Sequence, residues 1–234
     1  IEAAYPNVCA TTSLADILHD DDIKGVFVSA SPQSHFAIAS EVIKSGKALF
    51  IEKPPCQSED ELLQLISMRK EANFPQVTVG LQKRNAPVIR IMKKKLQKCR
   101  GNMSYNLKYL TGAYPEGDAL LDLFIHPLDY VTFLFGKAEV KFAEWVKHHT
   151  LMLVLKHEKA TGILELSTGY SWHDAKESMT VNTSNGIFEM NQMDSLIYKG
   201  KQTMFMGVPL EKVYPLKMVE VHLFDRNDFV PTIH

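Results

Sequence analysis

The stretch GVFVSASPQSHFAIASEVIKSGKALFIEKPP, residues 25–55, decides the fold of the first part of this chain. It contains two short apolar runs, Gly25–Ala30 and Ala48–Ile51. Neither run alternates apolar with polar residues, so we expect two strands that are buried on both faces, as in a parallel sheet. A helical pattern over residues 34–45 separates them and ends at a glycine. The stretch therefore predicts a right-handed β–α–β unit.

The alternation of helix and strand continues on either side of this stretch. Three further elements are expected: a short helix from Ser13, a helix that follows the capping box Ser58-x-x-Glu61, and a strand at Val77–Val79. Strands that alternate with helices in this way are typical of an open parallel sheet. Residues 1–83 are therefore expected to form a Rossmann-type domain.

This first domain is expected to be incomplete. The chain has twelve glycines, but none of them forms the G-x-G-x-x-G turn that holds a dinucleotide pyrophosphate. The chain also begins at Ile1 rather than at a methionine. We therefore expect the sequence to be a fragment.

The pattern changes after about Asn85 to many strands and few helices. One helix is expected where Ile89, Met92 and Leu96 recur at helical spacing, and a second over residues 119–135. Strands are expected at 105–110, 140–145, 151–155, 162–166, 179–183, 187–190 and 196–198, with Ser184-Asn185-Gly186 as a hairpin turn. Residues 84–234 are thus predicted to form an α/β domain with a large, mainly antiparallel open sheet, so the fold class combines α/β and α+β.

Composition limits the partners of this protein. The 26 basic and 27 acidic side chains give a net charge of -1, which lacks the basic excess that binding to nucleic acid requires. No apolar run approaches the roughly 18 residues of a membrane span. The three cysteines form no C-x-x-C pair, which favours reduced thiols in the cytoplasm. A small-molecule or protein partner is therefore expected.

Three residues have the chemistry of alcohol oxidation. Lys53 directly follows the second apolar run, so we expect it at the carboxyl edge of the parallel sheet, where open α/β folds bind ligands. Asp122 and His126 are four residues apart, so on one helical turn both would project from the same face. We expect His126 to accept the hydroxyl proton as hydride leaves, Asp122 to accept a hydrogen bond from the substrate, and Lys53 to share the proton.

Each of these residues also has a structural alternative. Lys53 would then be a surface lysine in a loop, Asp122 a helix cap, and His126 a histidine with its partners in the core. Pro127 disfavours the α conformation at the preceding residue and removes a helical hydrogen bond, so a kink is expected there.

Three motifs in this order resemble the glucose-fructose oxidoreductase, inositol dehydrogenase and rhizopine catabolism (Gfo/Idh/MocA) family: Ser31-Pro32-Gln33-Ser34-His35, Glu52-Lys53-Pro54 and Asp122-x-x-x-His126. The resemblance spans roughly residues 6–136. It implies an N-terminal Rossmann domain that binds NAD or NADP, and a C-terminal α/β domain with an open sheet. It also implies that the first β–α–β elements of that domain are missing here. The peptide before Pro54 is cis by the resemblance, whereas a trans proline in a turn is the default from the sequence alone.

The resemblance assigns further residues to the site. Those implied at the cofactor edge are Ser29, Ser31, Pro32, Gln33, His35, Glu52, Lys53 and Pro54, and those implied at the substrate are Gln82 and Arg84. Three of them have alternatives: His35 a structural role at the start of a helix, Arg84 a pair with an acid, and Glu52 an exposed position in a loop. A bulky Phe124 stands where glycine is common in the family, and we expect it to narrow the substrate pocket or to shift the helix.

The sequence thus predicts a cytoplasmic NAD(P)-dependent oxidoreductase that transfers a hydride between a nicotinamide cofactor and a hydroxyl-bearing carbon of a sugar, polyol or nucleotide-sugar. A homo-oligomer that forms through the C-terminal sheet is expected, and the fragment itself is expected to be inactive. No metal is expected, because His148, His149, His157 and His173 lack the spacing of a metal site. The alternatives are an NAD-dependent glycosidase of the same superfamily and a non-catalytic descendant that acts in binding or assembly.

Overall fold

A computed structural model describes residues 7–200, 203–205, 208–210 and 213–215 of the chain. The chain divides into two compact units, one that ends at Leu81 and one that begins at Gln82. This division falls two residues before the boundary that was expected after Lys83. None of the helices in the described ranges is long and apolar enough to cross a membrane.

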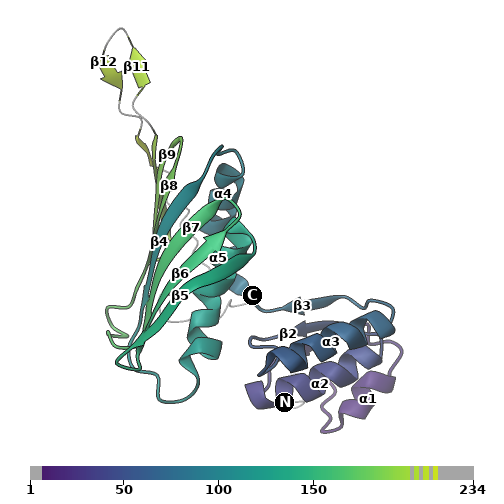
Figure 1. Ribbon diagram of the computed structural model, residues 1–234. Coiled ribbons are helices and arrows are strands. Elements are labelled where there is room, and N and C mark those ends of the chain that lie inside the picture. The colour runs from purple at the N-terminus through teal and green to yellow at the C-terminus, as the bar shows by residue number, and fades with distance from the viewer. Residues whose placement is uncertain (1–6, 201–202, 206–207, 211–212, 216–234) are drawn as a thin grey trace. The chain divides into compact units, whose positions relative to one another are not determined.

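The first unit contains a three-stranded parallel sheet in the order β1-β2-β3 (Figure 1). Its strands are β1 (Gly25–Val28), β2 (Ala48–Ile51) and β3 (Val77–Val79), and its helices are α1 (Leu14–His19), α2 (Pro32–Lys44) and α3 (Glu59–Glu71). Helices α2 and α3 lie side by side and enclose a small apolar core with the strands. The predicted incomplete Rossmann-type sheet is confirmed.

Local sequence explains where these helices begin. Pro32 occupies the first turn of α2, where its missing N–H costs nothing and its fixed φ suits the helix, so α2 begins two residues before the expected Ser34. The Ser58 hydroxyl accepts a hydrogen bond from the Glu61 N–H at 3.2 Å, and the Glu61 carboxylate accepts one from the Gln57 N–H at 2.7 Å. The predicted capping box at the start of α3 is therefore confirmed.

The expectation that the first strand is buried on both faces is wrong. Val28 is buried beside the helices, but the preceding Phe27 is 79% exposed and contacts the ring of Phe50 at a centroid distance of 5.2 Å. Successive side chains of a strand point to opposite faces, and α2 and α3 pack on the face that carries Val28. Burial of both faces requires helices on both, and these two helices cover one.

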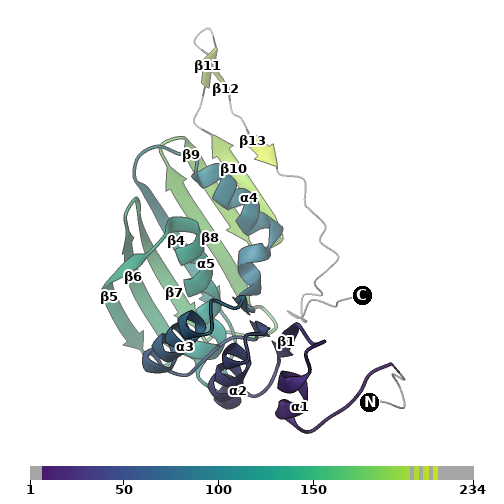
Figure 2. The same cartoon turned by 90° about the vertical axis from the view of Figure 1, so that its right-hand side faces the viewer.

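The second unit packs two helices on one face of an eight-stranded sheet, in the strand order β13-β10-β9-β8-β4-β7-β6-β5 (Figure 2). Five elements come first along the chain of this unit: η1 (Gln82–Asn85), α4 (Pro87–Leu96), β4 (Met103–Leu110), a π-helical turn η2 (Leu120–Phe124) and α5 (Ile125–Phe135). The later strands of this sheet are β5 (Ala138–Val146), β6 (Thr150–His157), β7 (Ala160–Ser167), β8 (Lys176–Thr183), β9 (Gly186–Asn191), β10 (Ser195–Gly200) and β13 (Val213–Pro215). Strands β11 (Thr203–Phe205) and β12 (Val208–Leu210) form a separate antiparallel pair. The predicted fold class is confirmed, as is the hairpin turn between β8 and β9.

One strand pair in this sheet differs from the rest. Strands β4 and β7 are parallel neighbours, with Leu110 opposite Ser167 at their ends. Every other pair in the described part of the sheet is antiparallel. The loops that follow β4 and β7 therefore begin at the same end of these two strands.

Helices α4 and α5 cover one face of the sheet, where the main core of the second unit lies (Figure 2). The ring of Tyr105 is 1% exposed, stacks on Phe135 at 4.5 Å between centroids and bonds through its hydroxyl to His157 Nε2 at 2.8 Å. This ring lies over Gly162, where an added Cβ would approach it to 1.9 Å. The glycine is thus required by packing rather than by backbone conformation.

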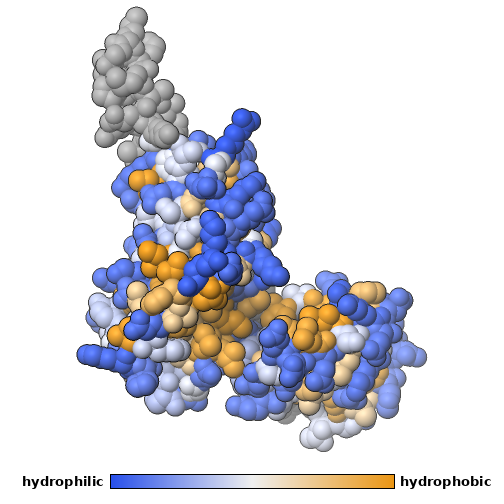
Figure 3. Space-filling view, viewed as in Figure 1, coloured by the Kyte–Doolittle hydropathy of each residue, from blue (hydrophilic) through white to orange (hydrophobic). Residues whose placement is uncertain are grey.

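The other face of the sheet carries an apolar row that the helices do not cover. Phe142 of β5 lies opposite Val154 of β6, which in turn lies opposite Ile163 of β7. Phe142 is 47% and Ile163 50% exposed. Strand β5 is the edge strand and is exposed along nearly its whole length, and apolar residues gather over it in Figure 3.

We predict that Gly162→Ala lowers the free energy of unfolding of the second unit by about 1–3 kcal/mol, because its methyl group displaces the buried Tyr105 ring. Urea unfolding followed by tryptophan fluorescence measures this, since both tryptophans, Trp145 and Trp172, lie in the second unit. Gly200→Ala in β10 is the control, because its Cβ would have no neighbour nearer than 3.5 Å. Equal stability of the two variants would contradict the packing argument.

Candidate functional site

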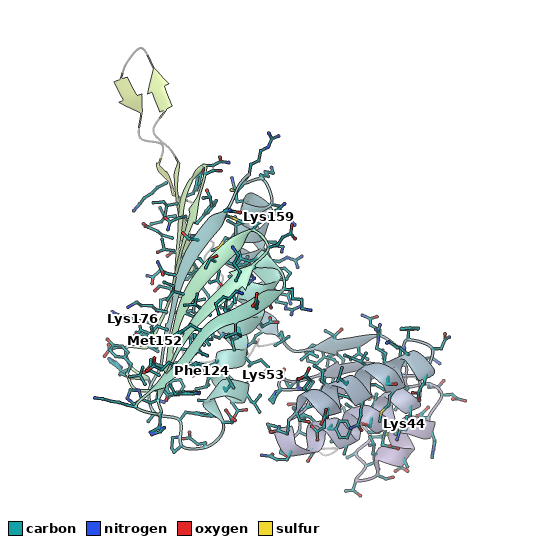
Figure 4. All side chains as sticks on the ribbon, in the orientation of Figure 1. Lys44, Lys53, Phe124, Met152, Lys159 and Lys176 are labelled. Atoms are coloured by element: carbon teal, nitrogen blue, oxygen red, sulfur yellow. The ribbon has the colours of Figure 1, made fainter. Side chains whose placement is uncertain are left out.

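The first unit gathers the predicted cofactor-edge residues at the carboxyl ends of its strands. Glu52 N–H donates to Val28 O at 3.0 Å, and Gly80 N–H donates to Ile51 O at 2.8 Å, so the ladder continues to the ends of all three strands. Lys53 comes next in the chain and is half-buried (Figure 4). The lysine thus lies at the sheet edge where open α/β folds bind ligands.

Two features shape the loop after β2. The Lys53–Pro54 peptide is cis, as the resemblance implied. The Glu52 carboxylate packs on Gly80, where an added Cβ would lie 3.0 Å from both carboxylate oxygens. Glu52 is half-buried, so the alternative of an exposed loop acid does not describe its surroundings.

His35 joins the loops that follow β1 and β2. Its side chain is buried, with Nδ1 2.7 Å from Pro54 O and Nε2 3.0 Å from Ala30 O. Each ring nitrogen thus lies within hydrogen-bond distance of a backbone carbonyl oxygen. These contacts correspond to the structural alternative for His35, because both ring nitrogens are directed at backbone rather than at solvent.

The loop after β1 leaves polar groups open. Ser29, Ser31 and Gln33 are exposed, Pro32 is half-buried, and the Ser31 hydroxyl lies 3.0 Å from that of Ser34. Hydroxyl groups, the first N–H groups of α2 and a nearby lysine are donors that suit the carboxamide and ribose of a nicotinamide nucleotide. The residues present at this edge therefore fit the nicotinamide end of a dinucleotide.

In the second unit, Asp122 and His126 lie on either side of a change in helix type. Asp122 belongs to the π-helical turn η2, and His126 is the second residue of α5. The wider π turn directly precedes Pro127, whose ring would clash with the carbonyl four residues earlier in a regular α-helix. The change from π-helix to α-helix thus lies three residues before Pro127.

The helix cap that was the structural alternative for Asp122 is formed by another residue, Asp118. Asp118 Oδ1 accepts hydrogen bonds from the N–H groups of Leu120 at 2.7 Å and Leu121 at 3.3 Å, so Asp118 caps η2. Asp122 itself is half-buried, and its Oδ2 accepts a hydrogen bond from the Tyr114 hydroxyl at 3.3 Å. Burial, followed by the charge of Asp122, raises the pKa of Tyr114.

A glycine permits this approach of Asp122. An added Cβ on Gly117 would lie 2.3 Å from Asp122 Oδ2 and 3.2 Å from the Tyr114 ring. His126 is buried at 8% exposure, with Tyr130 one turn further along α5. The Tyr114 phenol, the Asp122 carboxylate and the His126 imidazole thus all belong to one short segment of the second unit.

Phe124 does not line a pocket. It is completely buried, with its ring edge-on to Tyr109 at 6.3 Å and stacked with Trp145 at 6.2 Å between centroids. Figure 4 shows Phe124 toward the end of the sheet opposite Lys159. The side chain is part of the main core of the second unit and anchors η2 there.

Arg84 forms an ion pair, which was its structural alternative. Its Nε donates to both carboxylate oxygens of Asp129 at 2.8 and 2.7 Å, and its Nη2 also contacts Oδ1. Asp129 is 6% exposed and lies on α5, three residues after His126. The hydrogen bond with Asp129 raises the pKa of Arg84. Gln82 lies half-buried in the same short helix η1.

A second ion pair, which the sequence did not predict, lies beside the pair of Arg84 and Asp129. Lys83 Nζ lies 2.6 Å from Glu177 Oε2, with both side chains under 8% exposed, and 4.7 Å from the centroid of the Tyr109 ring. Burial, followed by the charge of Glu177, raises the pKa of Tyr130 well above its usual range. The one available signal was that Glu177 shares the inward face of β8 with apolar residues.

The two ion pairs fix η1 to different elements of the second unit. Lys83 binds β8, and Arg84 binds α5, which carries His126. Within the described residues, no group of three or more His, Cys, Asp or Glu side chains is placed to hold a metal ion.

Comparison with known proteins agrees with this arrangement. Residues 2–81 match the model of the GFO_IDH_MocA oxidoreductase family, described as an NAD-binding Rossmann fold. The first unit therefore carries the match to the Gfo/Idh/MocA oxidoreductase family. The match confirms the recognised family and the predicted cofactor class, NAD or NADP.

Relatives extend the likeness into the second unit. The putative oxidoreductase YceM of Salmonella typhimurium is 25% identical over 189 residues, which cover 77% of this chain and 60% of YceM. A levoglucosan dehydrogenase in complex with NADH and levoglucosan has a TM-score of 0.73 at 19% identity, over 88% of this chain and 64% of that one. The WlbA dehydrogenase of Bordetella pertussis, in complex with NADH and UDP-GlcNAcA, has a TM-score of 0.74 at 18% identity, over 87% and 66%. The chain thus spans less than two thirds of the length of YceM and of the levoglucosan dehydrogenase.

We predict that Arg84→Met lowers the free energy of unfolding of the second unit by about 1–3 kcal/mol, because it leaves the buried Asp129 carboxylate without its guanidinium. Adding Asp129→Leu to this variant should restore part of the loss. Urea unfolding followed by tryptophan fluorescence gives the coupling energy of the double-mutant cycle. Lys141→Met is the control, because Lys141 and its partner Glu139 are both exposed. A zero coupling energy between Arg84 and Asp129 would rule out the structural role.

Proposed function

We propose that the complete protein is an NAD(P)-dependent oxidoreductase that transfers a hydride between a nicotinamide cofactor and a hydroxyl-bearing carbon of a sugar, polyol or nucleotide-sugar. The observation that carries this proposal is Lys53 at the carboxyl edge of the parallel sheet, in a unit that matches an NAD-binding family. The structural neighbours that bind levoglucosan and UDP-GlcNAcA support a carbohydrate substrate.

In this proposal each site residue handles protons or positions the substrate. A bound nicotinamide supplies the hydride chemistry at its C4 carbon. His126 takes the proton of the substrate hydroxyl in the oxidative direction, and Asp122 accepts a hydrogen bond from a substrate hydroxyl group. Lys53 shares the same proton and stabilises negative charge on the reacting oxygen. The proposal requires that Lys53 of the first unit meets the other two around one carbon.

The remaining site residues bind and orient in this scheme. The exposed loop residues Ser29, Ser31 and Gln33, with Pro32, contact the nicotinamide or its ribose, and Glu52 and Pro54 complete that edge. His35 orients the loops of the same edge through the backbone carbonyl groups of Pro54 and Ala30. Gln82 contacts the substrate, whereas Arg84 supports α5.

We infer that the uncovered sheet face is where copies of this chain associate. Helices α4 and α5 cover the opposite face, and the row Phe142, Val154 and Ile163 is apolar across three neighbouring strands. A row of this kind loses contact with water when two copies pack face to face, which favours a symmetric dimer.

We predict that Ile163→Glu shifts the full-length protein toward the monomer in size-exclusion chromatography with light scattering, because it places a charge in the middle of the apolar row. Asn182→Glu, an exposed change on the same face of β8 but outside the row, should leave the oligomer intact. A monomeric parent protein, or two variants that dissociate equally, would refute the interface.

We predict that Lys53→Met in the full-length protein lowers turnover by about 10²–10⁴-fold, because the proton and charge of the ammonium act in the chemical step. Cofactor affinity should change by no more than about threefold, since a loss confined to the chemical step leaves ground-state binding intact. Lys44→Met is the matched control, because Lys44 is an exposed lysine in the last turn of α2 of the same unit (Figure 4). Stopped-flow NADH absorbance gives turnover, and fluorescence titration gives affinity. Unchanged turnover would remove Lys53 from the mechanism.

The same assays separate the proposal from the glycosidase alternative. Incubation of the full-length protein with NAD and a phenyl glycoside releases phenol without net formation of NADH if transient oxidation serves elimination. Net NADH from a free sugar, without release of phenol from the glycoside, supports the oxidoreductase.

A further inference from the structure

Two loops of the second unit meet at the edge of the sheet where β4 and β7 end. Residues 111–118 follow β4, and residues 168–175 follow β7. Backbone hydrogen bonds join them: Thr111 N–H donates to Ser167 O at 2.8 Å, and Tyr170 N–H donates to Thr111 O at 2.9 Å. The first loop then carries Tyr114 to the carboxylate of Asp122. The second loop is therefore held close to the candidate catalytic segment.

The second loop presents a tryptophan whose ring is fixed but uncovered. The Trp172 indole N–H donates to Ala113 O at 2.8 Å, one residue before Tyr114. Gly112 lies against the indole, since an added Cβ there would be 2.3 Å from Trp172 Cδ1. Despite these contacts, Trp172 is 52% exposed. A single exposed aromatic ring is common on protein surfaces, but this ring is already oriented by a hydrogen bond and a close backbone contact.

An oriented, exposed indole suits one kind of ligand surface. The ring of a sugar or cyclitol has a face of C–H bonds, which is apolar, and a rim of hydroxyl groups. Stacking that face on an indole removes apolar surface from water and places C–H hydrogens against the negative face of the π system. Because Trp172 is fixed beforehand, little side-chain entropy is lost on binding.

We propose that Trp172 is a substrate-contacting residue: its indole stacks on the C–H face of a sugar or cyclitol ring while a ring hydroxyl group bonds to Asp122. This assignment rests on the proposed function for the role of Asp122. It makes Trp172 the residue that selects cyclic substrates over acyclic polyols, because an acyclic chain has the same hydroxyl groups but no flat C–H face.

The second tryptophan of the chain provides a matched comparison. Trp145 is 46% exposed, similar to Trp172, but its ring stacks on the buried Phe124 at 6.2 Å between centroids. Trp145 and Trp172 are the two tryptophans in the sequence. Substitution of either by phenylalanine therefore separates the fluorescence response of one of these two indoles from that of the other.

The test uses the full-length protein with saturating NAD. In the Trp145→Phe variant, D-glucose, D-xylose or myo-inositol should change the emission of Trp172 in a saturable manner, and D-sorbitol at the same concentrations should not. In the Trp172→Phe variant the same ring compounds should leave the emission of Trp145 unchanged. An equal response to sorbitol, a response that follows Trp145, or no response to any ring compound would overturn the proposal.

Kinetics on the best ring substrate give a second test. Trp172→Ala should raise KM by about tenfold or more, which corresponds to the loss of roughly 1.4 kcal/mol of binding, with kcat nearly unchanged. Trp172→Phe should restore most of the affinity, because a flat aromatic face remains. Hydride transfer without any effect of Trp172→Ala on KM refutes the assignment but leaves the proposed function standing. A saturable change in emission without hydride transfer refutes the proposed function and retains Trp172 as a ring-binding residue.

Discussion

Parallel pairing between neighbouring strands is the constraint that brings the candidate residues together within each unit. In the first unit, the parallel strands β1, β2 and β3 bring Ser31, Lys53 and Gly80 to one edge of the sheet, although long helices separate them in sequence. In the second unit, the pair β4 and β7 is the parallel exception within the described part of an antiparallel sheet, and it brings the loops of Tyr114 and Trp172 together. Antiparallel pairing of either set would send these loops to opposite edges.

Buried polar contacts then fix the loops that the strands bring together. His35 binds the carbonyl groups of Ala30 and Pro54, so the loops after β1 and β2 are joined by one ring. Lys83 and Arg84 bind Glu177 and Asp129, so two adjacent cations hold η1 on two different elements. Buried ion pairs of this kind add little net stability over apolar packing, but a broken pair is costly. Their role here is to define one arrangement of the elements that carry the site.

Sequence periodicity predicted most helices and strands of both units from their local apolar patterns, but it did not predict η1, β11, β12 or β13. The position of Lys53 was predictable for the same reason, since a residue that follows a parallel strand must lie at the sheet edge. The bonds of His35 and the pair of Lys83 with Glu177 were not predictable, because their partners lie far away in sequence and depend on the fold. The exposure of Phe27 was missed because an apolar run does not reveal which of its faces is covered.

The proposed mechanism requires Lys53, Asp122 and His126 to act on one substrate molecule. Lys53 belongs to one unit, and Asp122 and His126 belong to the other. A crystal structure of the full-length protein with NAD and a bound sugar measures their convergence directly. We expect Lys53 Nζ and a ring nitrogen of His126 to lie within about 3.2 Å of the same substrate hydroxyl oxygen. Asp122 should accept a hydrogen bond from a hydroxyl group of the same sugar. A sugar bound elsewhere, or a reacting hydroxyl that neither Lys53 nor His126 contacts, would contradict the proposed mechanism.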